Sequence, residues 1–252
     1  MGKIVAIGGG EIGRKGYPVE TTSIDKEIIK LTGKKNPRVL FIPTASKDSE
    51  LYYAVVQKHF GERLDCKVDV LYLIREKLSL YEIRRKVFSS DIIYVGGGDT
   101  GFMLREWRRK GLDKILKEAY EKGIVISGVS AGAICWFKYG SSDTKKFKNP
   151  NDKRLTRLSC LGLVNLTVSP HHIREPHRKE GMIEIMRRTS GVGIALDDNC
   201  ALEIVDDRYR IISSKKGANA HKVYYSKGKL HYELLDKKKD YASLNELRNN
   251  KG

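Results

Sequence analysis

Short apolar runs alternate with charged segments over most of the chain. The runs are rich in Val and Ile, and four of the five are closed by Gly or Pro; they occupy residues 3–8, 38–43, 67–73, 91–96 and 123–128. Because they are apolar along their whole length, they predict strands of a mostly parallel sheet that is covered on both faces.

The segments between these runs predict helices. In residues 22–33, for example, four apolar side chains fall roughly on one face, and Thr22 or Ser23 can cap the helix. Strands that alternate with helices are typical of a three-layer α/β/α fold. In such a fold, ligands and chemistry gather at the carboxyl ends of the strands.

The pattern changes after about residue 200. Residues 201–214 and 221–235 have the pattern of β-hairpins, with turns at Asp206-Asp207 and at Ser226-Lys227-Gly228. We expect both hairpins as antiparallel additions at the edge of the sheet. No repeat, low-complexity tract or obvious linker divides the chain, so we interpret residues 1–252 as one α/β domain.

Composition is that of an ordinary globular protein. Hydrophobic residues make up 40% of the 252 positions, and no stretch approaches the roughly 20 apolar residues of a membrane span. The four cysteines are far apart and form no CxxC pair, which argues against a zinc site or a disulfide framework. These features predict a cytoplasmic protein without a membrane partner or a metal.

The net charge of +17 raises the question of nucleic-acid binding. One concentration of positive charge is the segment TKKFKNPNDKR at residues 144–154, whose role the sequence leaves open. Such runs are usually solvated loops, and no zinc finger, helix-turn-helix or RNA-binding signature accompanies them. Nucleic acid is therefore not the expected partner, although a basic binding protein without catalysis is an alternative.

Three glycine-rich stretches follow predicted strands: GGGEIG at 8–13, GGGDTG at 96–101 and GVSAG at 128–132. The first two match the GxGxxG pattern of dinucleotide-binding proteins. That fingerprint also needs an acidic residue at the end of the next strand to hold the ribose. The next strands end instead at residues 42–45, which read IPTA, and at the GVSAG turn, so nucleotide binding is not favoured.

The GVSAG stretch fits the GxSxG pattern of a nucleophile elbow, in which a sharp strand-to-helix turn exposes a serine hydroxyl. Gly128 and Gly132 would let the backbone fold tightly against its neighbours. An apolar segment with a helical pattern follows, and its first amides would face a developing oxyanion. We therefore predict that Ser130 is a nucleophile; the alternative is a phosphate-binding or purely conformational turn.

A serine hydroxyl needs a base to take its proton, and histidine is the usual one. Among the six histidines, His171 and His172 stand out because they follow the apolar run at residues 164–170. This run predicts a buried strand that brings them to the same edge as Ser130. The two side chains are adjacent and must point in different directions, so at most one of them is the base.

The motifs GGGDT (96–100), GVSAGA (128–133) and SPHH (169–172), in this order on an α/β chain, resemble the peptidase E and cyanophycinase family of serine peptidases. Members of that family have a fold similar to the class I glutamine amidotransferases, with serine in place of cysteine at the elbow. The resemblance extends to about residue 205. It implies amide hydrolysis through an acyl-enzyme, without a metal or an organic cofactor.

By this resemblance, Ser130 would be the nucleophile and His171, which follows Pro170, the general base. The glycine-rich loop would supply an oxyanion-hole amide from Gly97 or Gly98, paired with the amide of Ala131. An esterase of the α/β-hydrolase type is the alternative enzyme. In that class, however, the oxyanion motif usually lies further upstream than the 32 residues from Gly98 to Ser130.

A carboxylate is also needed to hold the imidazole in the right tautomer. In peptidase E an acidic residue lies a little past the helix after the elbow, which favours Asp143, 13 residues beyond Ser130. Asp197 and Asp198, after the apolar run at residues 191–196, are the alternatives, because the family also keeps an acidic residue near the site at that place.

The resemblance also implies a substrate class. Peptidase E removes an N-terminal aspartate from dipeptides, and cyanophycinase cuts a β-aspartyl-arginine polymer, so the expected substrate is a small peptide with an acidic acyl group. Arg174 and Arg178 are the nearest candidates to anchor such a group, and Asp99 of the GGGDT motif is a further substrate-binding candidate. The choice among such peptides and the oligomeric state, including a homodimer, are left open.

Overall fold

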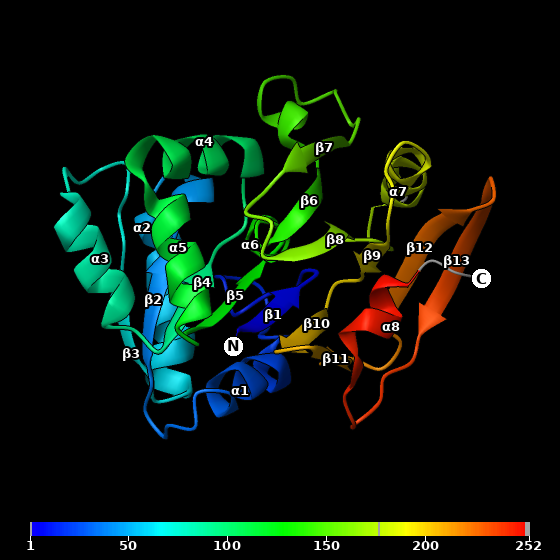
Figure 1. Ribbon diagram of the computed structural model, residues 1–252. Coiled ribbons are helices and arrows are strands. Elements are labelled where there is room, and N and C mark those ends of the chain that lie inside the picture. Colours follow the sequence, from blue (N-terminus) through cyan, green and yellow to red (C-terminus); the bar gives the residue numbers. More distant parts are fainter. Residues whose placement is uncertain (1, 176, 250–252) are drawn as a thin grey trace.

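The computed structural model describes residues 2–175 and 177–249, which form two β-sheets with helices around them (Figure 1). The predicted fold class, α/β with helices on both faces of a parallel core of strands, is confirmed. The division of the strands over two sheets was not anticipated from the sequence.

The first sheet has eight strands, and the apolar runs of the sequence form its centre. Neighbouring strands from β1 through β5, β4 and β2 to β3 are parallel, and β10, β11 and β14 extend the sheet beyond β1 in antiparallel fashion. In spatial order the strands are β14 (Ala242–Ser243), β11 (Arg208–Ser213), β10 (Cys200–Val205), β1 (Lys3–Ile7), β5 (Val125–Val129), β4 (Ile92–Val95), β2 (Arg38–Ile42) and β3 (Lys67–Val70).

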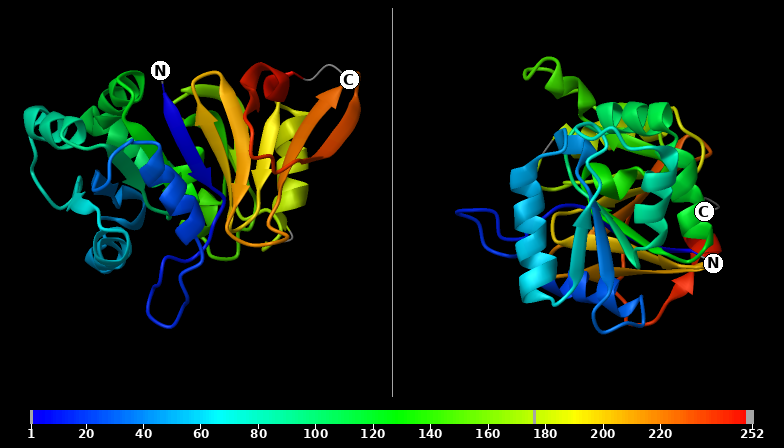
Figure 2. Two further views of the ribbon diagram at one scale, coloured as in Figure 1. Left: turned by 90° about the horizontal axis from the view of Figure 1, so that it is seen from below. Right: turned by 90° about the vertical axis from the view of Figure 1, so that its left-hand side faces the viewer.

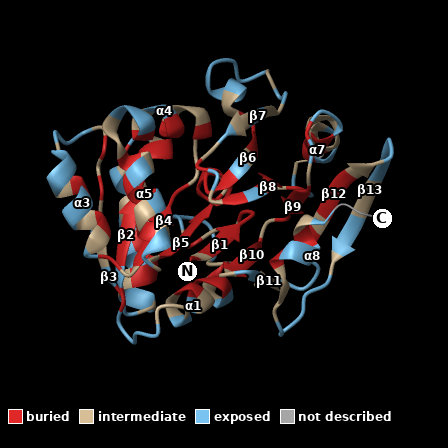
Figure 3. Cartoon of the chain, in the orientation of Figure 1, coloured by how far each residue is buried: buried red, intermediate tan, exposed pale blue. Residues whose placement is uncertain are grey.

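Helices cover both faces of this sheet, which explains why its central strands are apolar throughout (Figure 3). One face packs against α1 (Thr22–Lys30), α2 (Glu50–Val56) and the π-helical continuation η2 (Gln57–Arg63). The other packs against α3 (Leu80–Phe88), α4 (Thr100–Lys110) and α5 (Leu112–Glu121). Helix α1 confirms the prediction for residues 22–33, but its N-cap is Thr21 and no side chain caps it by a hydrogen bond.

The second sheet has six strands and lies beside the first (Figure 2). Both sheets contribute to one hydrophobic cluster, which includes Ile126 of the first sheet and Val168 of the second. Helix α7 (His177–Arg187) packs on the second sheet through Met182 and Met186. In spatial order its strands are β13 (Lys229–Leu235), β12 (Ala220–Ser226), β9 (Gly193–Leu196), β8 (Val164–Ser169), β6 (Phe137–Ser142) and β7 (Thr156–Ser159).

The apolar segment after Ser130 differs from its prediction. The expected helix is a single turn, α6 (Ala131–Ile134), and the chain then enters β6. Trp136 and Phe137 are fully buried in the cluster that joins the two sheets. Burial of these two large aromatic side chains therefore decides the local structure, in preference to the helical pattern.

Both predicted hairpins are present, with turns at the expected residues. Strands β10 and β11 extend the first sheet, as expected, whereas β12 pairs with β9 of the second sheet and β13 pairs with β12 at its edge. The remaining short elements are the 3₁₀ turns η1 (Thr44–Ser46) and η3 (Thr144–Phe147) and the C-terminal helix α8 (Leu244–Arg248). Within the described residues, no helix has the length and apolar character needed to cross a membrane.

Candidate active site

Ser130 lies in a sharp turn between β5 and α6. Its backbone has φ 57° and ψ −109°, a conformation that is costly for a residue with a side chain. The Ser130 N–H donates to the carbonyl of Ile7 on β1, and the Ser130 carbonyl accepts from Ala133. These bonds hold the strained turn in place and leave the serine hydroxyl free to point out of the sheet.

The two glycines of the turn are required by the closeness of β4. A Cβ atom at Gly132 would lie 2.0 Å from the carbonyl oxygen of Val95, and one at Gly128 would lie 2.5 Å from the same oxygen. Real Cβ atoms do not approach a backbone oxygen so closely. The predicted role of both glycines, tight packing of the turn against its neighbours, is therefore confirmed.

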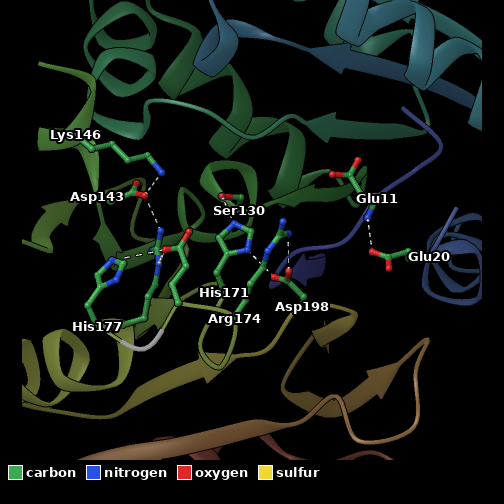
Figure 4. A network of polar contacts seen from close by, with 11 residues as sticks. Glu11, Glu20, Ser130, Asp143, Lys146, His171, Arg174, His177 and Asp198 are labelled. Atoms are coloured by element: carbon green, nitrogen blue, oxygen red, sulfur yellow. Dashed lines mark hydrogen bonds and ion pairs between the residues drawn. The ribbon is translucent and has the colours of Figure 1, made fainter. Parts of the chain in front are cut away.

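His171 reaches the Ser130 hydroxyl from the loop that follows β8. Its Nε2 lies 2.9 Å from Ser130 Oγ, and its Nδ1 lies 2.5 Å from Asp198 Oδ1 (Figure 4). A carboxylate can only accept, so Nδ1 carries the proton and Nε2 accepts from the serine hydroxyl. His171 itself has a positive φ of 54°, and its N–H donates to the carbonyl of Gly8.

Asp198 is held as a charged group next to His171. Burial acts to raise the pKa of Asp198, but the hydrogen bonds and charges of His171 and Arg174 outweigh burial and lower the pKa below its ordinary value. Arg174 Nη1 lies 3.0 Å from Asp198 Oδ2, so each carboxylate oxygen has its own partner. The carboxylate therefore remains ionised throughout the neutral range.

Asp143, the favoured partner of His171 in the sequence analysis, is elsewhere. Its Oδ2 lies 2.7 Å from Nη2 of Arg178, and it also forms an ion pair with Lys146 (Figure 4). Arg178 is only 2% exposed and is held as well by Glu175. Asp143 thus neutralises a buried guanidinium, and the histidine partner is Asp198, which the sequence offered as an alternative.

The other alternative, Asp197, also points away from His171. Its Oδ2 accepts the backbone N–H of Asn219 at 2.8 Å, and burial raises the pKa of the Asp197 carboxyl. Asp197 directly follows the end of β9, whereas Asp198 lies in the turn that leads into β10. The two aspartates therefore have different environments although they are adjacent in sequence.

Gly9 is part of the site, and the sequence analysis treated it only as part of a GxGxxG pattern. A Cβ atom at this position would lie 1.9 Å from Asp198 Oδ1 and 2.5 Å from His171 Nδ1. The space that a side chain would occupy is thus filled by the contact between these two residues. The available signal was that GGGEIG, like GGGDTG and GVSAG, follows a predicted strand of the parallel sheet and so lies at the same sheet edge.

The substitution Gly9→Ala is expected to lower kcat about a hundredfold, because the methyl group displaces His171 or Asp198 by a distance comparable to 1 Å. Gly61→Ala, at a position without a positive φ where a Cβ would lie 3.6 Å from Val68, is the control for loss of a glycine elsewhere in the fold. Steady-state hydrolysis rates at matched folded fractions measure the effect. Equal rates for the two variants would refute the proposed crowding at Gly9.

His172 points into a different environment. Its Nε2 hydrogen-bonds to the hydroxyl of Tyr232, and its ring lies 5.5 Å from that of His221. Burial, with smaller contributions from His221 and Lys179, lowers the pKa of His172 to about 4. His172 is therefore a neutral, buried side chain rather than the base that faces Ser130.

This lowered pKa predicts acid sensitivity. In the unfolded chain His172 takes up a proton near pH 6.5, whereas the folded protein resists protonation until about pH 4. The contribution of His172 to stability is therefore complete above pH 6.5 and is lost as the pH falls toward 4, by about 2 to 3 kcal/mol. Urea unfolding of wild type and His172→Gln between pH 7 and 4.5 measures it; parallel pH dependences would contradict the prediction.

The residues expected to form an oxyanion hole are only partly assembled. A Cβ at Gly97 would lie 3.4 Å from Ser130 Cβ, so Gly97 is next to the serine, but its N–H donates to the Tyr52 hydroxyl at 3.3 Å. Ala131 begins α6 directly after Ser130. Gly98 instead packs against Ala45, whose carbonyl oxygen would lie 2.2 Å from a Cβ there.

Of the three substrate-binding candidates, only Arg174 faces the site. Asp99 caps α4 by accepting the N–H of Phe102 at 3.1 Å and is also bonded to the Thr144 hydroxyl. Arg178 is the buried partner of Asp143. Asp99 and Arg178 thus make their contacts within the fold and do not line the cavity beside Ser130, and their role toward substrate stays a prediction.

A cavity of about 860 Å³ opens beside Ser130 and His171. One part of its wall is the loop after β1, at residues 10–15, and another is α2 with the start of η2. Its surface is largely apolar, with contributions from Tyr52, Tyr94 and Val129, and it carries several cations. These are Arg14, Lys15, Lys58 and Arg174.

The sequence and the fold match a known class of proteins. The family model described as peptidase family S51 matches residues 4–212. The chain is 36% identical over 229 residues to the uncharacterized peptidase YgaJ of Bacillus subtilis, covering 88% of this chain and 92% of that one. Over 182 residues it is 24% identical to peptidase E of Streptomyces coelicolor, covering 68% and 69% of the two chains.

A solved structure supports the fold. The crystal structure of a peptidase from an acI-B1 Actinobacterium superposes with a TM-score of 0.72 at 21% identity and covers 96% of this chain and 97% of that one. Together these findings define an α/β peptidase. The chain belongs to peptidase family S51, as its resemblance to peptidase E implied.

Proposed function

We propose that this protein is a serine peptidase that hydrolyses small peptides through an acyl-enzyme on Ser130. The observation that carries the proposal is the continuous set of hydrogen bonds from Ser130 Oγ through His171 to Asp198. The three groups have the order of a nucleophile, a base and a carboxylate that orients the base. They come from β5, from the loop after β8 and from the loop after β9.

In the proposed acylation step, His171 Nε2 takes the proton of the Ser130 hydroxyl while Oγ bonds to the carbonyl carbon of the substrate. The imidazolium is stabilised by the ionised Asp198 and then gives its proton to the leaving amine as the C–N bond breaks. Water, activated by the same histidine, subsequently attacks the ester carbonyl and releases the acid together with free Ser130.

The oxyanion of each tetrahedral intermediate would be stabilised by the amides of Ala131 and Gly97. For Gly97 this requires that its N–H exchange the Tyr52 hydroxyl for the substrate oxygen. Each donor of this kind contributes about a hundred- to a thousandfold in rate, because it faces charge that develops only in the transition state.

We propose an acidic acyl group for the substrate, because four cations and a single carboxylate line the cavity beside Ser130 in the described part of the chain. Such an excess of positive charge favours the entry of an anionic substrate. A cytoplasmic location, from the scattered cysteines, remains a prediction from the sequence, which leaves the oligomeric state open.

A substrate panel tests the proposed function. It comprises aspartyl and β-aspartyl peptides, peptides with neutral acyl residues, and simple esters, each assayed with the wild-type enzyme. In a separate experiment, the enzyme is treated with a fluorophosphonate, which labels an activated serine. Hydrolysis of peptides and labelling at Ser130 are expected. Cleavage of esters alone would favour the esterase alternative. A folded sample that shows no cleavage and no labelling would overturn the proposal. Nucleic-acid binding that weakens with salt would then be examined.

A further inference from the structure

The Tyr52 hydroxyl lies at one of the two amides that are proposed to stabilise the oxyanion. Tyr52 belongs to α2, and it lines the cavity beside Ser130 together with Gly97 and Val129. The Gly97 N–H donates to the hydroxyl oxygen of Tyr52 at 3.3 Å. The proposed acylation step gives this hydroxyl no task, so its place beside the nucleophile needs an explanation.

The residues around Tyr52 hold its ring in a defined position. The Tyr52 N–H donates at 3.3 Å to the hydroxyl of Ser49, which caps α2. The ring meets that of Phe41 edge-on, with 5.1 Å between the centroids, and a Cβ atom at Gly96 would lie only 2.8 Å from Tyr52 Cε1. The hydroxyl is therefore pre-positioned and does not have to be ordered when a substrate binds.

The Tyr52 hydroxyl also has an unused proton. A phenolic hydroxyl donates one hydrogen bond and accepts others. Its oxygen accepts from Gly97, but among the described residues the hydroxyl forms no hydrogen bond as a donor. Burial of Tyr52, with a smaller contribution from the charge of Glu11 on the cavity wall, raises the pKa of the hydroxyl above its ordinary value. The group therefore keeps its proton at neutral pH, and this proton is available to a molecule in the cavity.

Gly97 connects this hydroxyl to the nucleophile. A Cβ atom at Gly97 would lie 3.4 Å from Ser130 Cβ and 3.8 Å from Ser130 Oγ. The carbon that bonds to Oγ in the tetrahedral intermediate must therefore lie close to Gly97. The oxygen on that carbon is then within reach of the Gly97 N–H, as the proposed oxyanion site requires.

One oxygen atom can contact Gly97 and Tyr52 at the same time. The Gly97 nitrogen and the Tyr52 hydroxyl oxygen are 3.3 Å apart. An acceptor oxygen lies about 2.9 Å from an amide nitrogen and about 2.7 Å from a hydroxyl oxygen. These three distances form a closed triangle. The oxyanion can therefore replace Tyr52 as the acceptor of the Gly97 N–H while the tyrosine stays in its place.

We propose that Tyr52 is a catalytic residue whose hydroxyl donates a hydrogen bond to the oxyanion, beside the amides of Gly97 and Ala131. The inference rests on the proposed peptidase function and deepens it. In the free enzyme the hydroxyl oxygen accepts the Gly97 N–H, and during the reaction its proton stabilises the charge that develops on the substrate oxygen. No proton is transferred, because the phenol stays neutral and the oxyanion keeps its charge.

Tyr52→Phe removes one oxygen atom and keeps the ring with its contact to Phe41. It is expected to lower kcat for the best peptide of the panel by about a hundredfold, as the loss of another oxyanion donor does, and to leave KM within about threefold of wild type. Rates are divided by the concentration of Ser130 that a fluorophosphonate labels to completion, so unfolded protein is not counted.

Tyr53→Phe is the matched control at the next position of α2. The ring of Tyr53 packs edge-on against that of Tyr72 and does not line the cavity beside Ser130. Loss of its hydroxyl should leave kcat within about twofold of wild type. Equal losses of kcat in Tyr52→Phe and Tyr53→Phe would show a general effect of α2 and overturn the role of Tyr52.

A peptide aldehyde separates a role in the transition state from a structural one. Ser130 Oγ adds to the aldehyde carbon, and the aldehyde oxygen then takes the place of the oxyanion in a tetrahedral adduct. Tyr52→Phe is expected to weaken inhibition by the aldehyde about tenfold or more and to leave inhibition by the corresponding alcohol, which forms no adduct, within about twofold. A structural role would weaken both inhibitors by the same factor.

Failure of this inference is distinguishable from failure of the proposed function. If Tyr52→Phe retains the kcat of wild type, or weakens the aldehyde and the alcohol equally, the role of Tyr52 is overturned while Ser130-dependent hydrolysis stands. If no peptide in the panel is cleaved and no serine is labelled, the proposed function and this inference are both overturned.

Discussion

Replacement of Ser130 by alanine is expected to lower kcat by about 10⁴- to 10⁶-fold while the fold is retained. The proposed reaction requires a covalent bond from Oγ to the substrate, and no other hydroxyl occupies that place next to His171 Nε2 in the described residues. The residual rate would come from the oxyanion donors and from binding alone. Steady-state hydrolysis of the best peptide in the panel measures the loss.

Ser127→Ala is the matched control for this experiment. Ser127 lies on the same strand, three residues earlier, and its buried hydroxyl donates to the Val5 carbonyl at 2.7 Å. Loss of that bond should lower the free energy of unfolding by about 1 kcal/mol and leave kcat nearly unchanged. If Ser130→Ala retained more than a tenth of wild-type activity, the acyl-enzyme mechanism would be refuted.

Asp198→Asn is expected to lower kcat by about 10³- to 10⁴-fold. An amide can donate to Nδ1, which would place the histidine proton on Nε2 and prevent this atom from accepting the proton of Ser130. The loss should be smaller at high pH, where hydroxide in solution can replace the general base. The pH profile of kcat for wild type and variant measures this change.

Asp143→Asn gives the direct comparison, since the sequence favoured this residue for the same role. Its carboxylate is bonded to the buried Arg178, so we expect a loss of stability of about 1 to 3 kcal/mol and little change in kcat of the folded enzyme. Thermal unfolding and activity at a temperature where both variants are folded separate the two effects. If Asp143→Asn and Asp198→Asn lost kcat equally, Asp143 would also have a catalytic role.

The sequence predicted Ser130 because its signal is local. A strand, two glycines and a serine within five residues specify a turn whose geometry needs no information from distant parts of the chain. Gly128 and Gly132 are required because β4 lies so close to them, but their positions can be recognised from the spacing within the GVSAG motif alone. The central strands were predictable for a similar reason, because burial on both faces makes a strand apolar at every position.

The choice among Asp143, Asp197 and Asp198 could not be made in this way. Asp143 follows β6, and Asp197 and Asp198 follow β9, the two parallel neighbours of the strand β8 that precedes His171. The topology therefore brings all three to the same edge of the second sheet, and the conformation of the loops after these strands decides which one reaches His171. The position of Arg178 could not be predicted in this way either. Its nearness in sequence to His171 suggested a cation near the substrate, but the folded chain buries it against Asp143.

Taken by itself, the chain determines the central strands of its first sheet, its two C-terminal hairpins, the turn that exposes Ser130 and the histidine pair after β8. These features follow from local periodicity and from steric rules that act over a few residues. Only the tertiary structure decides that Asp198 is the partner of His171, that Gly9 must lack a side chain and that Glu11 enters the cavity. The requirement at Gly9, for example, depends on contact with Asp198, which is more than 150 residues away in the sequence and whose position in space no local pattern encodes.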